Sequence, residues 1–138
     1  MNLLIHFLQC GVSPPILPSL IRFHPHLDPR QYLKYDLPEP IQTENTQSMA
    51  SLLFGFFTYY SQFDFENQAI SITAGNIYKR GVVDKESSKK MIISNPYYNA
   101  NSNADLASHV HYASFRASCK KSLESLTSSF KLFSLPCL

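Results

Sequence analysis

The sequence predicts an α+β fold that is mainly helical and contains a small sheet of two or three strands. Apolar residues recur at helical spacing over residues 49–60 and 112–130, and two short runs, 69–73 and 91–93, have the pattern of strands. The chain has 138 residues, of which 44% are hydrophobic and 13% aromatic. This length and composition suffice for the core of one domain, and they exclude a wholly disordered chain.

The first 44 residues have the pattern of the end of a helical region followed by a Pro-rich connection. Residues 3–9 are mostly apolar and precede Cys10-Gly11, which is typical of a helix end. A helix that starts at Met1 has neither an N-cap nor an acidic first turn, so we expect the chain to begin inside a longer helix. Prolines then predict extended backbone, and residues 22–43 are expected to form a loop.

Residues 45–132 are expected to hold most of the core, and residues 133–138 to form a short tail. Asn45 or Thr46 is the expected N-cap of a helix whose wide aromatic face places it at the centre of the core. That face comprises Met49, Leu52, Leu53, Phe56, Phe57 and Tyr60.

The two predicted strands and a second long helix follow. The strand at 69–73 ends at Gly75, a basic polar loop is expected over 76–90, and the strand at 91–93 stops at Asn95-Pro96. We expect the last helix to begin near Asn103 or Asp105. Its apolar stripe comprises Tyr112, Phe115, Cys119, Leu123, Leu126 and Phe130.

Charge and cysteine content narrow the function classes. Twelve Lys and Arg stand against ten Asp and Glu, and this formal charge of +2 does not by itself indicate nucleic-acid binding. Three cysteines without close spacing argue against a secreted disulfide framework and favour an intracellular, reducing compartment. No apolar run approaches the roughly 18 residues that a membrane span requires, so no membrane contact is expected.

No pattern in the chain supports catalysis on its own. Glycine-rich phosphate loops and the nucleophile elbow are absent, and the acidic residues are too scattered to converge on Mg²⁺. The pairs His24/His26 and His109/His111 lack the further ligands of a zinc site. Cys119 lies on an apolar stripe, which favours a buried thiol over a nucleophile. The residues alone therefore predict neither a catalytic site nor a metal site.

Several segments resemble one family in order and spacing. Residues 3–9 with Pro14-Pro15-Ile16-Leu17-Pro18 resemble the "FLQ … PPhLP" pattern of noncanonical poly(A) polymerases and terminal uridylyltransferases. Asn45-Thr46 with the aromatic run 52–60 and Phe63-Asp64-Phe65 resembles the start of their PAP-associated domain. Residues 70–75 are similar to the family's "ISI..G" strand, and residues 92–97 to its "h.h.DPF" nucleotide-recognition segment. The proline run and Asn45-Thr46 are most similar to the mitochondrial poly(A) polymerase branch.

The resemblance implies the central and PAP-associated part of an RNA 3′-terminal nucleotidyltransferase, a polynucleotide adenylyltransferase that acts in polyadenylation. In that family the catalytic carboxylates, which bind Mg²⁺ or Mn²⁺, precede the "FLQ" helix. We therefore expect this chain to lack them and to be inactive alone. ATP, an RNA 3′ end and the missing catalytic domain are the implied partners, and a homodimer is left open. The branch implies a mitochondrial location, with cytoplasm and nucleus as alternatives.

The motif positions also single out candidate site residues. Asn95 stands where the family often has an Asp that reads the base edge, and Asn101 stands where uridine-selective members carry His. An amide both donates and accepts, which suits adenine, whereas an Asx turn and ordinary loop polarity are the structural alternatives. Candidates for contacts with the RNA backbone are Lys79, Arg80, Lys89 and Lys90, joined by Arg116, Lys120 and Lys121 on the last helix; the alternative is a solvated surface.

Two other interpretations of the whole chain remain open at this point. One is a module without catalysis that binds RNA or a protein partner through apolar surface. The other is a truncated gene product without a stable fold of its own.

Overall fold

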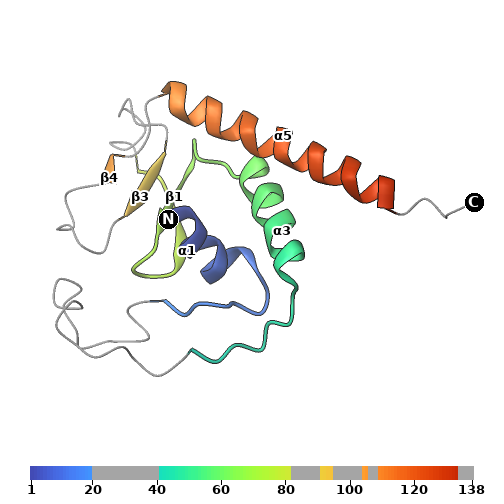
Figure 1. The fold of residues 1–138 in the computed structure, drawn as a ribbon. Coiled ribbons are helices and arrows are strands. Elements are labelled where there is room, and N and C mark those ends of the chain that lie inside the picture. The colour runs from blue at the N-terminus through green and yellow to red at the C-terminus, as the bar shows by residue number, and fades with distance from the viewer. Residues whose placement is uncertain (20–40, 82–90, 95–103, 106–108, 134–138) are drawn as a thin grey trace, which may run out of the picture.

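The computed structural model describes residues 1–19, 41–81, 91–94, 104–105 and 109–133, with side chains of the last helix described from 112 to 129. Figure 1 shows a long helix, α5, crossing one end of α3, with the strands grouped beside α1. In chain order the elements are α1 (Asn2–His6), the π-helix η1 (Phe7–Gly11), α3 (Met49–Gln62), β1 (Gln68–Ser71), β2 (Asn76–Lys79), β3 (Ile92–Ser94), β4 (Ala104–Asp105) and α5 (His109–Phe133). The predicted α+β class is confirmed.

The sheet has the strand order β2-β1-β3-β4. β1 is antiparallel to β2 and parallel to β3, while β3 is antiparallel to β4. The strands predicted at 69–73 and 91–93 are therefore present as β1 and β3, and the sheet contains two strands more. β2 lies inside the region expected to be a loop. Its residues are mostly exposed, so the alternation of apolar and polar residues that marks a half-buried strand is missing there.

The core lies where α1, η1, the sheet and the two long helices meet. Cys119 is 1% exposed, in agreement with the predicted buried thiol, and burial raises the pKa of that thiol. The partly buried Tyr112 and Phe115 pack beside it, as the predicted stripe on the last helix requires. Other fully buried core side chains are Phe7, Tyr60, Phe65, Ile70, Ile72, Ile92 and Ile93.

The aromatic helix α3 is central only over its last turns. Tyr60 is 0% exposed, but Met49 is 81% and Leu53 47% exposed, so the prediction that the whole apolar face is buried is wrong for the first half. The predicted cap is also wrong. The hydroxyl of Ser48 accepts a hydrogen bond from the Ser51 N–H (3.2 Å), as an N-cap does. Asn45 instead donates its amide to the carbonyl oxygen of Pro14 (2.7 Å).

The ends of the other helices show one agreement and one difference. α1 begins without a side-chain cap, as expected from the sequence. α5 begins at His109 rather than near Asn103 or Asp105, because Ala104 and Asp105 pair with β3 as the short strand β4. Most of the loop predicted over 22–43 lies outside the described residues.

Candidate functional site

The predicted base-reading residues belong to the connection between β3 and β4. Asn95 and Asn101 lie outside the described residues, but the strands on both sides of them are described. Ile93 pairs with Ala104, so the sheet holds the residues that enter and leave the connection 95–103 close together. Ile92 and Ile93 are 1% and 2% exposed, which anchors β3 in the core. We call this pair of strand ends, Ser94 and Ala104, the recognition edge.

β1 supports the recognition edge from the other side of β3. Ile70 pairs with Ile93 and Ser71 with Ser94 in parallel register. Ile70 is fully buried, so the register is fixed by packing, because a slip of one residue would turn buried side chains toward solvent. The position of the recognition edge therefore depends on the position of β1.

The basic residues predicted to contact RNA lie in different environments. Lys79 is exposed at the end of β2, where a cationic side chain can meet a phosphate. Arg80 is 5% exposed and donates from Nη1 to the carbonyl oxygen of Phe65 (2.9 Å). Its guanidinium is thus buried and stabilises the backbone at Phe65, whereas a surface position was expected. Lys89 and Lys90 lie outside the described residues.

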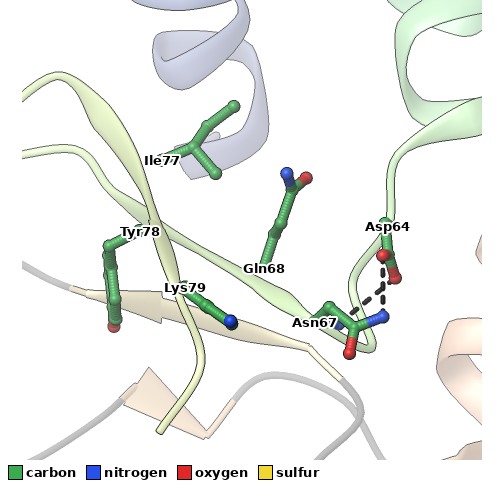
Figure 2. Close-up of a pocket in the computed structure, with 6 residues that line it drawn as sticks. All are labelled: Asp64, Asn67, Gln68, Ile77, Tyr78 and Lys79. Atoms are coloured by element: carbon green, nitrogen blue, oxygen red, sulfur yellow. Dashed lines mark hydrogen bonds between the residues drawn. The ribbon is translucent and has the colours of Figure 1, made fainter.

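Lys79 borders an open hollow of about 400 Å³ (Figure 2). The carboxylate of Asp64 lies at its rim and accepts hydrogen bonds from the backbone N–H of Glu66 (3.1 Å) and of Asn67 (3.2 Å), and from the Asn67 amide (2.8 Å). These bonds, above all the one from the Asn67 side chain, lower the pKa of Asp64. The carboxylate therefore forms a turn and is poorly suited to acid–base chemistry. The hollow is lined by Asp64, Asn67, Gln68, Ile77, Tyr78 and Lys79.

The cations of α5 are also divided between structure and surface. Arg116 donates from Nε to the carbonyl oxygen of Ser61 in the last turn of α3 (3.2 Å) and from Nη1 to the Tyr112 hydroxyl (3.2 Å). It therefore satisfies a carbonyl that the end of α3 leaves free. Lys120 and Lys121 are exposed and remain available to an anionic partner.

Sequence reasoning missed a group of contacts made by η1. The amide of Gln9 donates to the carbonyl oxygens of Pro18 (3.0 Å) and Ile72 (3.1 Å), and the thiol of Cys10 donates to that of Gly75 (3.0 Å). Gly75 has φ +61°, and a Cβ there would lie 2.7 Å from the Cβ of Ser19. The signal in the sequence was Gln9, an amide among apolar residues, which predicts a buried hydrogen bond.

A second missed feature is a buried histidine. His6 is 0% exposed, and its Nδ1 lies 2.9 Å from the hydroxyl of Tyr60, which itself donates to the carbonyl oxygen of Leu3 (2.7 Å). Because the hydroxyl has a single hydrogen, it must accept from Nδ1–H, so Nε2 carries no proton in the neutral ring. Burial lowers the pKa of His6 to about 4. A neutral ring locked in this way serves structure rather than proton transfer at pH 7.

Metal and membrane features are missing from the part of the chain that the structure describes. Within it, no three His, Cys, Asp or Glu side chains gather as metal ligands would. None of the described helices combines the length and apolarity of a membrane span.

Known proteins are similar to this chain in sequence over the region that contains these strands. Residues 48–101, which include β1, β2 and β3, match the family model described as Cid1 family poly A polymerase. Poly(A) RNA polymerase gld-2 homolog A of Drosophila melanogaster is 42% identical over 84 residues, or 56% of this chain and 6% of that protein. The Speckle targeted PIP5K1A-regulated poly(A) polymerase of Danio rerio is 34% identical over 84 residues, or 54% of this chain and 10% of that protein. This chain thus corresponds to a small share of each relative's length.

Solved structures share the fold over most of the chain. The structure of mtPAP in complex with UTP has a TM-score of 0.71 at 22% identity, covering 91% of this chain and 28% of mtPAP. The GLD-2/RNP-8 complex gives a TM-score of 0.61 at 24% identity, covering 91% of this chain and 40% of the matched chain. At these identities the match establishes the fold alone. Together, the family model over residues 48–101 and the sequence relatives support a noncanonical poly(A) polymerase family for this chain, and the shared fold is consistent with it.

Proposed function

We propose that this chain forms the base-recognition and RNA-binding side of an RNA 3′-terminal adenylyltransferase. The observation that carries the proposal is the recognition edge, which holds both ends of the connection that contains Asn95 and Asn101. Both asparagines fall within the family-matched region 48–101. In this proposal the two amides read the base, because an amide can accept from and donate to adenine's edge.

The phosphoryl chemistry belongs to a domain outside the 138 residues. In this proposal that domain also holds the divalent ion that would stabilise the transferring phosphate. Among the described residues, no three His, Cys, Asp or Glu side chains gather as metal ligands. This chain contributes positioning: it orients the ATP base and offers cations to RNA phosphates. The cations assigned to that role are Lys79, Lys89, Lys90, Lys120 and Lys121, whereas Arg80 and Arg116 hold the fold together.

The branch and compartment are finer parts of the proposal. The gld-2 homologs of Drosophila melanogaster match at 42% and 43% identity, whereas the likeness to mtPAP is one of fold. We therefore favour a gld-2-like adenylyltransferase over the mitochondrial branch that the sequence motifs predicted. The mitochondrial location loses support with that branch, and a cytoplasmic or nuclear location is then preferred.

The purified 138-residue chain should add no nucleotides to RNA. Incubation with ATP, Mg²⁺ or Mn²⁺ and a radiolabelled RNA oligonucleotide is expected to leave the RNA length unchanged, because the proposal assigns the metal-binding carboxylates to another domain. An active poly(A) polymerase under the same conditions is the positive control. Extension that co-purifies with the chain through successive columns would refute the assignment of catalysis to another domain.

Changes at Asn95 and Asn101 test base recognition in the longer polymerase that contains this chain. Asn101→His should move the ratio of UTP to ATP incorporation toward UTP by about tenfold, since one base-edge contact is worth roughly 1–3 kcal/mol. Asn95→Ala should raise KM for ATP. Asn99→Ala, in the same connection but without an assigned role, is the matched control. Unchanged selectivity and KM in both test variants would contradict the proposed function.

One observation favours a second function, a module that binds a protein partner. Met49, Leu53 and Phe54 on the first half of α3 are 81%, 47% and 37% exposed, and apolar surface of this kind is typical of interfaces. A homodimer would also cover it. The Asn101→His experiment distinguishes this function, because a partner-binding module would leave nucleotide selectivity unchanged.

A further inference from the structure

We propose that Gln9 is a positioning residue for nucleotide recognition, acting through the sheet on the recognition edge. The inference rests on the proposed function, because it assumes that the connection between Ser94 and Ala104 reads the base. It adds a residue on a different element, η1, that no motif singled out for this role.

The contacts of Gln9 join three segments that are distant in sequence. Its side chain is 6% exposed, and Nε2 donates both hydrogens, one to the carbonyl oxygen of Pro18 (3.0 Å) and one to that of Ile72 (3.1 Å). Both acceptors have fixed surroundings, since Ile72 is 2% exposed and Ser19, next to Pro18, lies against Gly75. A buried amide that uses both hydrogens in this way holds η1, the connection after it and the end of β1 at fixed separations.

The path from Gln9 to the recognition edge is short. Ile72 directly follows Ser71, and Ser71 pairs with Ser94, the last residue of β3. A shift of the β1 end relative to η1 would therefore move Ser94 with it. Cys10 adds a second point of attachment on the same turn, through its bond to the Gly75 carbonyl (3.0 Å). The turn after β1 is thus held at two carbonyls by neighbouring residues of η1.

Removal of the amide would leave two carbonyls near the core without this donor. Methionine at position 9 keeps the length and volume of the side chain but cannot donate a hydrogen bond. The end of β1 would then be free to relax toward other donors, including water. Recognition groups must be held within roughly 0.5 Å of their productive positions, so a small relaxation weakens nucleotide binding before it unfolds the sheet.

The decisive measurement is the kinetic constants of Gln9→Met in the longer polymerase. KM for ATP should rise about three- to tenfold while kcat changes less than about twofold, since the variant disturbs binding and leaves the reacting groups in place. Gln9→Glu, which has the same shape and lacks the amide donor, should act in the same direction. Asn45→Ala is the matched control, because its amide bonds the Pro14 carbonyl at an exposed site outside the sheet.

Hydrogen exchange provides a readout besides activity. Gln9→Met should increase exchange at the backbone amides of β3, and Asn45→Ala should not. If Asn95 and Asn101 variants raise KM while Gln9→Met does not, the inference about Gln9 is overturned and the proposed function stands. If the Asn95 and Asn101 variants change neither KM nor selectivity, the proposed function fails, and the inference fails with it.

Discussion

Replacement of Tyr60 by alanine is expected to lower the free energy of unfolding by about 3–5 kcal/mol, the usual cost of removing a buried aromatic side chain. Tyr60 is 0% exposed and packs its ring against Phe56 (centroids 5.0 Å apart) and Phe65 (6.0 Å). It also contacts Phe115 of α5 (6.0 Å), so the cavity would open between α3, α5 and the segment before β1. The free energy of unfolding of such domains is only about 5–15 kcal/mol. Chemical denaturation should therefore unfold the variant at a much lower denaturant concentration than the wild type.

The neighbouring tyrosine supplies a matched control for the hydroxyl of Tyr60. Tyr60→Phe leaves Nδ1–H of His6 and the carbonyl of Leu3 without their partner and should cost about 1–3 kcal/mol. The hydroxyl of Tyr59 is buried and has no hydrogen-bond partner among the described residues. Tyr59→Phe is therefore expected to leave stability unchanged or slightly raised. Equal losses in the two phenylalanine variants would contradict the network drawn around His6.

Acidification between pH 6.5 and 4 is expected to destabilise the chain through His6. Burial among the rings of Tyr59, Tyr60 and Phe63 lowers the pKa of His6 from 6.5 to about 4. The unfolded chain therefore binds the proton more readily than the folded chain. The contribution of neutral His6 to the free energy of unfolding is fully present above pH 6.5. It decreases as the pH falls through this window, and the free energy of unfolding changes no further through His6 below about pH 4. The full loss is about 3 kcal/mol, because each pKa unit corresponds to roughly 1.4 kcal/mol.

Denaturation curves at several pH values, with His6→Asn for comparison, test this dependence. Asparagine places an amide donor near the position of Nδ1 and does not titrate, so its stability should be nearly flat between pH 6.5 and 4. Asp64 does not interfere, since its lowered pKa makes its contribution disappear only below its usual value of 3.8. A wild-type chain whose stability is also flat across this window would show that His6 is not held neutral.

The sequence predicted the helices and strands that have strong periodicity. It did not predict how much of each element is buried by its neighbours. The stripe on α5 located Cys119 in the core, and the alternation at 69–73 located β1. The same reasoning wrongly predicted that the apolar face of α3 is buried along its whole length. Periodicity identifies the apolar face of a helix, but it does not show which turns contact a neighbouring element. η1 and α5 pack on the part of α3 near Tyr60, and the turns around Met49 remain exposed.

Polar side chains were harder to place, because their partners are distant backbone groups. Lys79 and Arg80 are neighbours in sequence, yet Lys79 is exposed whereas Arg80 is buried and donates a hydrogen bond to the Phe65 carbonyl oxygen. Gln9 and His6 bond to groups at Ile72 and Tyr60, more than fifty residues away, which no local pattern reports. Asn95 and Asn101 depend on the family resemblance and stay predictions.

The burial of α1 and η1 has a consequence for any transfer of the family-matched region 48–101 into another protein. Phe7 belongs to the same hydrophobic core as Tyr60 and Ile72 of the family-matched region 48–101, and His6 is 0% exposed beside Tyr60. A recombination event that transferred only that region would bring Tyr60 without its histidine and Ile72 without its glutamine. We therefore expect a transfer of region 48–101 without α1 and η1 to yield a less stable chain.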